Sequence, residues 1–202
     1  MGEVDMKDAT DLNLEEFSVS IAVTDDDIDL ARSALCIARI ESPGLVIASV
    51  LDQFDQLAEK VLKSIDQQAP VLENVRILLD IVLRGQNLQG AAETSSVDYY
   101  DPKNSFINRV LERGVGIPIA LSVILISIGT RAGIALGGTS MPMHFLIRVL
   151  GVDPPSFVDC YGGGRILTHK DCRMGLHRMT GGRIRFRPSM LSLISNTSIL
   201  FR

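Results

Sequence analysis

Residues 114–134, GVGIPIALSVILISIGTRAGI, contain the clearest structural signal in this chain. Gly114 and Gly116 interrupt any preceding helix, and Pro118 stands where proline suits the first turn of a new one. From Pro118 to about Arg131 the residues are apolar on almost every side, which is typical of a helix covered from several directions. We therefore predict a buried central helix over residues 118–131.

The same apolar run is too short for a membrane, because Val115–Ile128 cannot cross a hydrocarbon core of roughly 30 Å. The chain opens on an acidic stretch, so a secretory signal is not predicted. Its three cysteines, Cys36, Cys160 and Cys172, cannot all pair and match no zinc-ligand spacing. These features predict a cytoplasmic protein with reduced thiols, no metal and no cofactor.

Upstream of the central helix, apolar residues recur at steps of three and four, which predicts a layer of amphipathic helices. Thr24 and the aspartates after it are a helix start signal, because side-chain oxygens cap free N–H groups. Asn104 or Ser105 is predicted to cap the last of these helices in the same way. Helices are expected from the aspartates to Ile40, then over 45–64, 70–84 and 104–112, with a long polar loop over 85–97.

Beyond residue 137 the pattern changes from helical to extended, with strands predicted over 144–149, 157–159 and 184–186. Helices followed by a run of antiparallel strands indicate the α+β class. The predicted organisation is an acidic mobile tail (1–16), an N-terminal helical region (17–95), a core (96–189) and a C-terminal segment (190–202). Because Met190–Ile194 begin an apolar helical pattern, this last segment is predicted to start a truncated helical annex.

The charges are divided along the chain. Residues 1–30 are crowded with Asp and Glu, whereas Arg and Lys dominate after Gly164. A basic face for phosphate or an acidic partner is one interpretation, but two solvated faces that pair with each other are favoured. Aromatic residues make up only 5% of the chain and Trp is absent, which argues against modules that stack single-stranded nucleic acid.

Three blocks then carry a resemblance: YYDPKNSFINRVLERGVGIPIALSVILISIGTRAGI (99–134), MPMHFLIRV (141–149) and FVDCYGGGRILTHKDC (157–172). They closely resemble the bacterial SirB-type proteins, a branch of the transglutaminase-like superfamily, and the helical lead-in from Asp25 does so more loosely. The resemblance implies a papain-like fold with a catalytic Cys at the start of the buried helix, a His on the next strand and an Asp on the one after. Such a helix stabilises a thiolate, the imidazole accepts its proton, and the carboxylate orients the imidazole.

The resemblance places His144 and Asp159 at the family's His and Asp positions, but it places Pro118 at the nucleophile position. Proline offers neither a nucleophile nor an N–H group. We therefore predict a vestigial dyad in which His144 and Asp159 lie in contact near the start of the central helix. Without the resemblance, a buried histidine bound to a carboxylate is more simply a packing feature.

Other side chains are weaker candidates for the missing nucleophile. Ser122 lies one turn into the apolar helix, where serine more often bonds back to a carbonyl. Cys160 should point to the opposite strand face from Asp159. The remaining histidines, His169 and His177, are predicted to be surface residues in a basic loop, and the three glycines over 162–164 to form a tight turn.

These residues favour a non-catalytic regulatory or protein-binding domain, because the nucleophile is replaced by Pro118. Proteins of the resembled family are commonly regulators or attached to tetratricopeptide repeats, which implies a protein partner and a helical repeat annex in the full-length chain. The alternative is a hydrolase or transglutaminase-type enzyme that uses His144 and Asp159 with a substituted nucleophile or activated water. Nucleic-acid binding through the arginine-rich end is a third, disfavoured interpretation, and no membrane partner is predicted.

Overall fold

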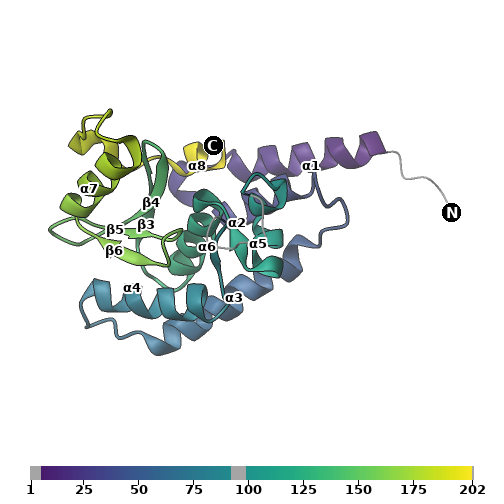
Figure 1. Cartoon of the computed structure of the whole chain (residues 1–202). Coiled ribbons are helices and arrows are strands. Elements are labelled where there is room, and N and C mark those ends of the chain that lie inside the picture. The colour runs from purple at the N-terminus through teal and green to yellow at the C-terminus, as the bar shows by residue number, and fades with distance from the viewer. Residues whose placement is uncertain (1–5, 92–98, 202) are drawn as a thin grey trace.

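The computed structural model of the chain describes residues 6–91 and 99–201 (Figure 1). Helices surround a central helix that packs on one face of a small antiparallel sheet, which confirms the predicted α+β class. In chain order the elements are α1 (Met6–Ile21), the 3-10 turn η1 (Asp25–Asp27), α2 (Leu30–Ala38), α3 (Ile47–Ser64), α4 (Val71–Leu79), the π-helical turn η2 (Asp80–Arg84), β1 (Gln89–Gly90), the 3-10 turn η4 (Pro102–Asn104), α5 (Ile107–Arg113), β2 (Val115–Gly116), α6 (Pro118–Arg131), β3 (Leu136–Met141), β4 (His144–Val149), β5 (Ser156–Asp159), β6 (Arg165–Leu167), α7 (His169–Thr180), the 3-10 turn η5 (Pro188–Leu191) and α8 (Asn196–Leu200).

Helix α6 forms the centre of the molecule, as its apolar sequence predicts. Every residue from 120 to 129 is buried. The helix contacts α2, α3 and α5 on its helical side, and β3 and β4 on its sheet side. Such cover is strongly stabilising, because each Å² of apolar surface removed from water contributes about 25 cal/mol. Within the described residues, no helix is both long and apolar enough to cross a membrane.

The main sheet is antiparallel, with its strands in the chain order β3–β4–β5–β6. Its two faces are covered differently. Phe145, Ile147 and Val158 pack with α6 in the main core, whereas Leu146 and Phe157 pack with α7 in a smaller apolar cluster. Alternating side-chain direction along each strand produces this division. A second, two-stranded sheet pairs β1 with β2 in parallel immediately before α6.

The predicted mobile tail is wrong for residues 6–16, because they belong to helix α1. This helix is held by contacts with distant parts of the chain. Phe17 lies edge-on to Phe201 with 6.0 Å between ring centroids, and Glu16 forms an ion pair with Arg39. Tertiary packing of this kind stabilises helices whose own sequence pattern is weak, which is why periodicity did not predict it.

Helix α2 begins later than predicted. The Thr24 hydroxyl donates a hydrogen bond to Asp27 within turn η1, and the carboxylate of Asp29 accepts from the N–H of Arg32 to cap α2. The helix then ends at Ala38, two residues before the predicted end. Several neighbouring aspartates can serve as a cap, so composition alone could not identify the one used.

The sheet contains two strands that the sequence did not predict and lacks one that it did. Residues 184–186 form no strand, and the outer partner of β5 is β6. Strand β3 was missed because it contains Gly137 and Gly138, which have low strand propensity. A side chain at 138 would force its neighbours to move, since a Cβ there would lie 2.6 Å from Ile199 and 2.9 Å from Phe145.

Helix α5 is not capped by Asn104 or Ser105. Asn104 is buried, and its side-chain amide donates to the carbonyl of Tyr99 at 3.3 Å. Phe106 occupies the cap position of α5 without a side-chain bond. Of the polar loop predicted over 85–97, residues 89–90 form β1, and residues 92–97 lie outside the described part of the chain.

The helix predicted from Met190 is also wrong. Residues 188–191 form turn η5, Leu193 bridges to Thr139 at the edge of β3, and α8 follows. The carboxylate of Asp25 accepts the backbone N–H groups of Asn196 and Thr197 at 2.8 and 2.9 Å. The C-terminal segment is therefore fastened to η1, α2 and β3.

Replacing Asp25 with alanine should loosen this attachment. We expect Asp25→Ala to lower the free energy of unfolding by about 1–2 kcal/mol, as the loss of a helix N-cap does. Burial alone would raise the pKa of Asp25, but hydrogen bonds from Thr197 and Asn196 outweigh it and lower the pKa. Urea denaturation at neutral pH measures the difference. Asp26→Ala removes a neighbouring exposed carboxylate as the control, and equal effects of the two variants would contradict the attachment.

Candidate functional site

His144 and Asp159 meet at the end of two adjacent strands. His144 begins β4 and Asp159 ends β5. Because Ile147 pairs with Val158, side-chain alternation places His144 and Asp159 on the same face of the sheet. Their Nε2 and Oδ1 atoms lie 2.9 Å apart, and the two side chains are only 13% and 6% exposed. The structure thus brings the two predicted residues into direct contact.

The Asp159 carboxylate has two further donors. Arg165 Nη2 donates to Oδ2 and the backbone N–H of Gly162 donates to Oδ1, each at 2.8 Å. Burial would raise the pKa of Asp159, but the bonds from His144, Arg165 and Gly162 outweigh it and lower the pKa to about 2. The carboxylate is therefore ionised at neutral pH. Glycine is required at 162, because a Cβ would lie 2.4 Å from Oδ2.

The imidazole of His144 lies against aromatic side chains. Tyr161 is edge-on to it at 6.2 Å between ring centroids, and Tyr99 is edge-on to Tyr161 at 6.4 Å. Tyr161 in turn packs on Gly90 of β1, where a Cβ would come within 2.6 Å of its ring. Because the ionised carboxylate accepts a hydrogen bond from Nε2–H, Nδ1 is the hydrogen-bond acceptor of the neutral ring. Such a ring can orient or bind a donor, or accept a proton from one.

Pro118 occupies the first position of α6 and is partly buried. The hydroxyl of Ser122 donates back to the Pro118 carbonyl at 2.8 Å, which confirms the predicted bond within the helix. The same hydroxyl lies 3.6 Å from the sulfur of Cys160. Cys160 therefore packs into the core against α6, whereas Asp159 beside it bonds to His144, as the predicted alternation requires.

None of the three cysteines is suited to act as a nucleophile. All are free and buried. Burial is the main cause that raises the pKa of each thiol, to about 12 for Cys160 and about 11 for Cys172, with Cys36 also raised. Only the thiolate is a nucleophile, so these thiols are inert at neutral pH.

The two remaining histidines lie on helix α7, so the predicted basic loop is wrong. His177 is exposed, but His169 is partly buried between Phe157 and Phe186, each 5.8 Å away between ring centroids. Glycines 162–164 form the predicted turn. Across residues 6–91 and 99–201, no three His, Cys, Asp or Glu side chains gather as a metal site would require.

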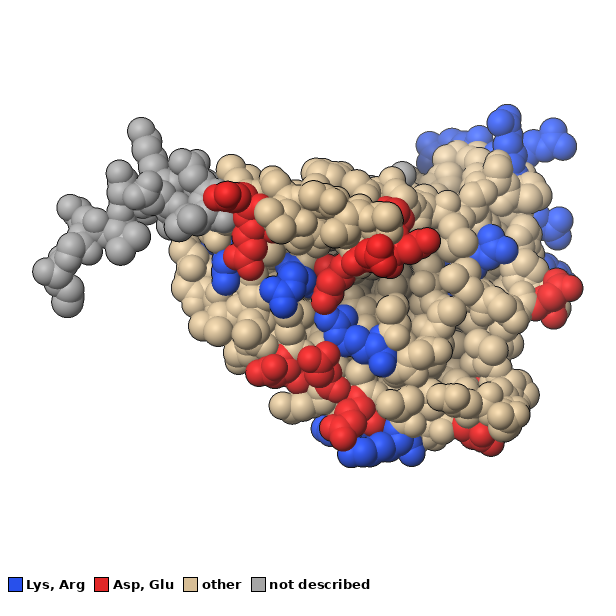
Figure 2. Space-filling view, turned by 180° about the vertical axis from the view of Figure 1, so that it is seen from behind, with Lys and Arg blue, Asp and Glu red and all other residues tan. Residues whose placement is uncertain are grey.

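The basic side chains after Gly164 gather over α7 and the segment that follows it, on one side of the molecule (Figure 2). The favoured interpretation, that they pair with the acidic N-terminal residues, is not supported. Described N-terminal acids such as Glu16 and Asp29 pair with Arg39 and Arg131 instead. Six basic side chains form no ion pair within the described part of the chain: Lys170, Arg173, Arg178, Arg183, Arg185 and Arg187.

Sequence reasoning missed the third side chain of the site, Arg165. It stands opposite Asp159 in the β5–β6 pair, so the turn between the strands brings the two charges together. A signal was present in the sequence. Asp159 and Arg165 flank the three consecutive glycines, and opposite charges on either side of a tight turn favour a hairpin.

Comparison with known proteins identifies relatives of this chain. The chain is 32% identical over 166 residues to a UPF0162 protein of Xylella fastidiosa, which covers 82% of this chain and 58% of that protein. It is 30% identical over 173 residues to the UPF0162 protein PA3419 of Pseudomonas aeruginosa, covering 86% and 61%. With F-box only protein 21 of Homo sapiens it shares 28% identity over 147 residues, covering 62% and 23%. The chain therefore spans about 60% of the length of these UPF0162 relatives.

No solved structure matches the chain. The family model of the transglutaminase-like superfamily, however, matches residues 48–202. This match covers the central helix, all four strands of the main sheet and the His144–Asp159 pair. The chain therefore belongs to the transglutaminase-like superfamily.

Proposed function

We propose that this chain is a non-catalytic transglutaminase-like domain of the SirB type that acts by binding a protein partner in a regulatory role. The observation that carries the proposal is Pro118 at the first position of α6, where the resemblance puts the catalytic cysteine. No native thiol can replace it, because all three are buried with a raised pKa. Covalent thiol catalysis then has no nucleophile in the described chain.

The bonding of Asp159 supports a structural role for the pair. A catalytic carboxylate needs only to orient its histidine, whereas Asp159 also joins Arg165 and the turn at Gly162. These bonds connect β4, β5 and β6 at one end of the sheet. In this proposal, His144 and Asp159 are retained as a vestigial dyad that holds the strands together.

The relatives support the use of this fold as one module of longer proteins. The matched region makes up 23% of F-box only protein 21 and 58% of the Xylella fastidiosa protein. We therefore keep three parts of the sequence interpretation as proposals: a protein partner, a C-terminal helical repeat annex in the full-length chain, and a core over residues 96–189. A cytoplasmic location is proposed on the three unpaired thiols.

Restoring a cysteine at position 118 tests the proposal. In Pro118→Cys, the start of α6 should lower the pKa of the new thiol below the ordinary value of about 8.5. We nevertheless expect no turnover of amide or ester substrates, because a thiolate also requires donors aimed at the developing oxyanion. The pH dependence of iodoacetamide labelling gives the thiol pKa, and a hydrolysis assay is run beside it.

Two further variants are the controls for this test. Pro118→Ala shows what the loss of proline alone does to folding, and Pro118→Cys combined with His144→Ala shows whether any activity depends on the imidazole. Robust turnover by Pro118→Cys that disappears in the double variant would contradict the non-catalytic proposal. It would mean that the remainder of an active site had been kept.

The intact His144–Asp159 pair favours one alternative, hydrolysis through water activated by His144. A panel of amide and ester substrates, assayed with the native chain and with His144→Ala, distinguishes this hydrolase from the non-catalytic binding domain. Turnover by the native chain that is lost in His144→Ala supports the enzyme, and an inactive native chain supports the binding domain.

A further inference from the structure

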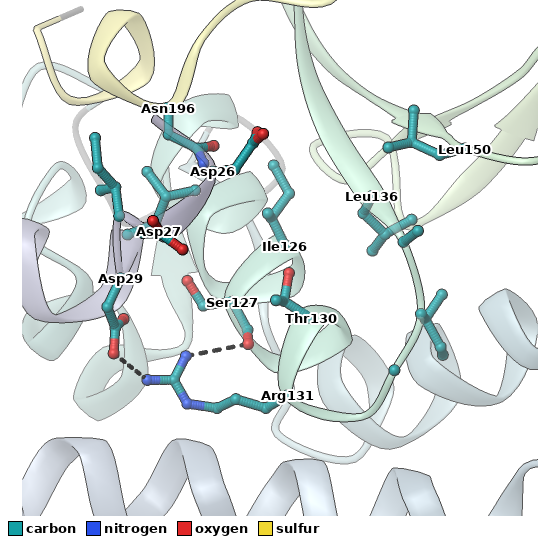
Figure 3. Close-up of a pocket in the computed structure, with 15 residues that line it drawn as sticks. Asp26, Asp27, Asp29, Ile126, Ser127, Thr130, Arg131, Leu136, Leu150 and Asn196 are labelled. Carbon is teal, nitrogen blue, oxygen red and sulfur yellow. Dashed lines mark hydrogen bonds and ion pairs between the residues drawn. The ribbon is translucent and has the colours of Figure 1, made fainter. Parts of the chain in front are cut away.

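A hollow of about 690 Å³ lies at the other end of α6 from Pro118. Turn η1, the last turn of α6, the start of β3 and Asn196 of α8 enclose it (Figure 3). Because α6 has 14 residues, its two ends are separated by about 20 Å. The hollow is therefore distinct from the His144–Asp159 pair, and none of its lining residues belongs to that pair.

The walls of the hollow are mainly apolar. Leu30, Ile126, Ile134 and Leu136 contribute buried aliphatic side chains, and Leu150 lies at its edge. Small-molecule sites typically occupy 300–1,000 Å³ and combine such walls with a few placed polar groups. The size and lining of this hollow match that description.

The charges around the hollow favour a cation. Asp26, Asp27 and Asp29 line it, and the first two form no ion pair within the described residues. The single cationic side chain in the lining, Arg131, already forms hydrogen bonds and ion pairs within the protein. It donates to Asp29 at 2.7 Å, to Asp55 at 2.9 Å and to the carbonyl of Ser127 at 3.2 Å. An incoming anion would face the uncompensated carboxylates.

Two further features of α6 also favour a cationic ligand. Ser127 is among the residues that line the hollow, and its hydroxyl is buried and has no hydrogen-bond partner in the described chain. Ser127 lies on the side of α6 that faces Asp27 and Asp29 (Figure 3), and buried hydroxyls without a partner are rare and costly. The C-terminal end of α6 also forms this wall, and the helix dipole favours positive charge there.

We propose that the hollow binds a small organic cation with an apolar body, such as an alkylammonium group. Its ammonium takes the carboxylates of Asp26 and Asp27 as counter-ions, beside the buried hydroxyl of Ser127. Its alkyl part replaces water against the apolar wall. Binding of this kind is independent of the proposed function, since it uses neither Pro118 nor the His144–Asp159 pair.

Hexylammonium, 1-hexanol and hexanoate are matched probes, because they share an alkyl chain and differ in charge. We expect hexylammonium to bind the full chain in the millimolar range, at about 1–10 mM, as its few atoms allow. The alcohol should bind at least about fivefold more weakly, and hexanoate more weakly still. Amide chemical-shift titration measures each affinity, with the largest shifts expected at residues 126–136.

Variants locate the binding. Asp27→Asn and Asp26→Asn should each weaken hexylammonium binding, by about twofold to fivefold, whereas Asp52→Asn on α3 removes an exposed carboxylate elsewhere and should not. Ala135→Phe should block the hollow for all three probes, since Ala135 is an exposed residue of its lining. Thermal melting confirms that each variant folds. Equal affinity for the three probes, or hexylammonium binding that survives Ala135→Phe, would overturn the proposal.

Discussion

In the folded protein, we expect Cys160 to react with iodoacetamide at least about a thousandfold more slowly than in the unfolded chain. Burial raises the pKa of this thiol from 9.0 to about 12. Only the thiolate reacts, and each pH unit below the pKa reduces its fraction about tenfold. Peptide mapping by mass spectrometry at neutral pH follows the modification of each cysteine with time, in buffer and in guanidinium.

The other two cysteines are the internal controls of this experiment. Cys172, with a pKa of about 11, should also react slowly, and all three thiols should react at similar rates once the chain is unfolded. Rapid modification of a single cysteine in the folded protein, accompanied by loss of any activity or binding, would contradict the absence of a native nucleophile. It would identify that cysteine as the reactive residue.

We expect Asp159→Ala to lower the free energy of unfolding by about 3 kcal/mol. The substitution removes the hydrogen-bond acceptor for His144, Arg165 and the N–H of Gly162, and it leaves the partly buried imidazole without its partner. Denaturation in urea at pH 7 measures the loss. Asp153→Ala removes an exposed carboxylate from the β4–β5 turn and should change stability by less than about 0.5 kcal/mol.

The pH dependence of stability provides a second measure of the same interaction. The folded-state pKa of Asp159, about 2, lies below its ordinary value of 3.8, so its contribution is complete above about pH 4. It is lost as the pH falls from about 4 to about 2, and the difference of about 1.8 units corresponds to roughly 2.4 kcal/mol. Asp159→Asn should therefore lose less stability than the native chain over this interval. Parallel acid profiles would contradict the assignment.

The sequence predicted those elements whose own pattern is strong. Helix α6 is apolar all round, and α3 has a regular amphipathic pattern, so both were predicted within two residues of their observed ends. Strand β3 and helix α1 depend on distant partners, and their local sequences are weak or misleading. Gly137 and Gly138 lower the strand signal of β3, although it is at Gly138 that Ile199 packs closely on the strand.

The candidate site was predicted in part. The resemblance located His144 and Asp159, and the structure confirms their contact, but their proposed vestigial role still depends on the experiments above. Arg165 was missed because the pattern of residues 165–167 is too short to predict a strand, and only the hairpin register places it opposite Asp159. Pro118 was predicted correctly as the first residue of its helix, because proline has a strong positional preference there.

The bonds between Asp25 and the residues that begin α8 have a consequence for synthesis on the ribosome. They join positions 171 and 172 residues apart in the chain. Asp25 can form them only after Asn196 and Thr197 have left the ribosome, and closing so long a loop carries an entropic cost. Contacts of high sequence separation also slow folding. The attachment of η1 and α2 to α8 is therefore among the last contacts to form during translation, and until then the surface that α8 covers stays exposed.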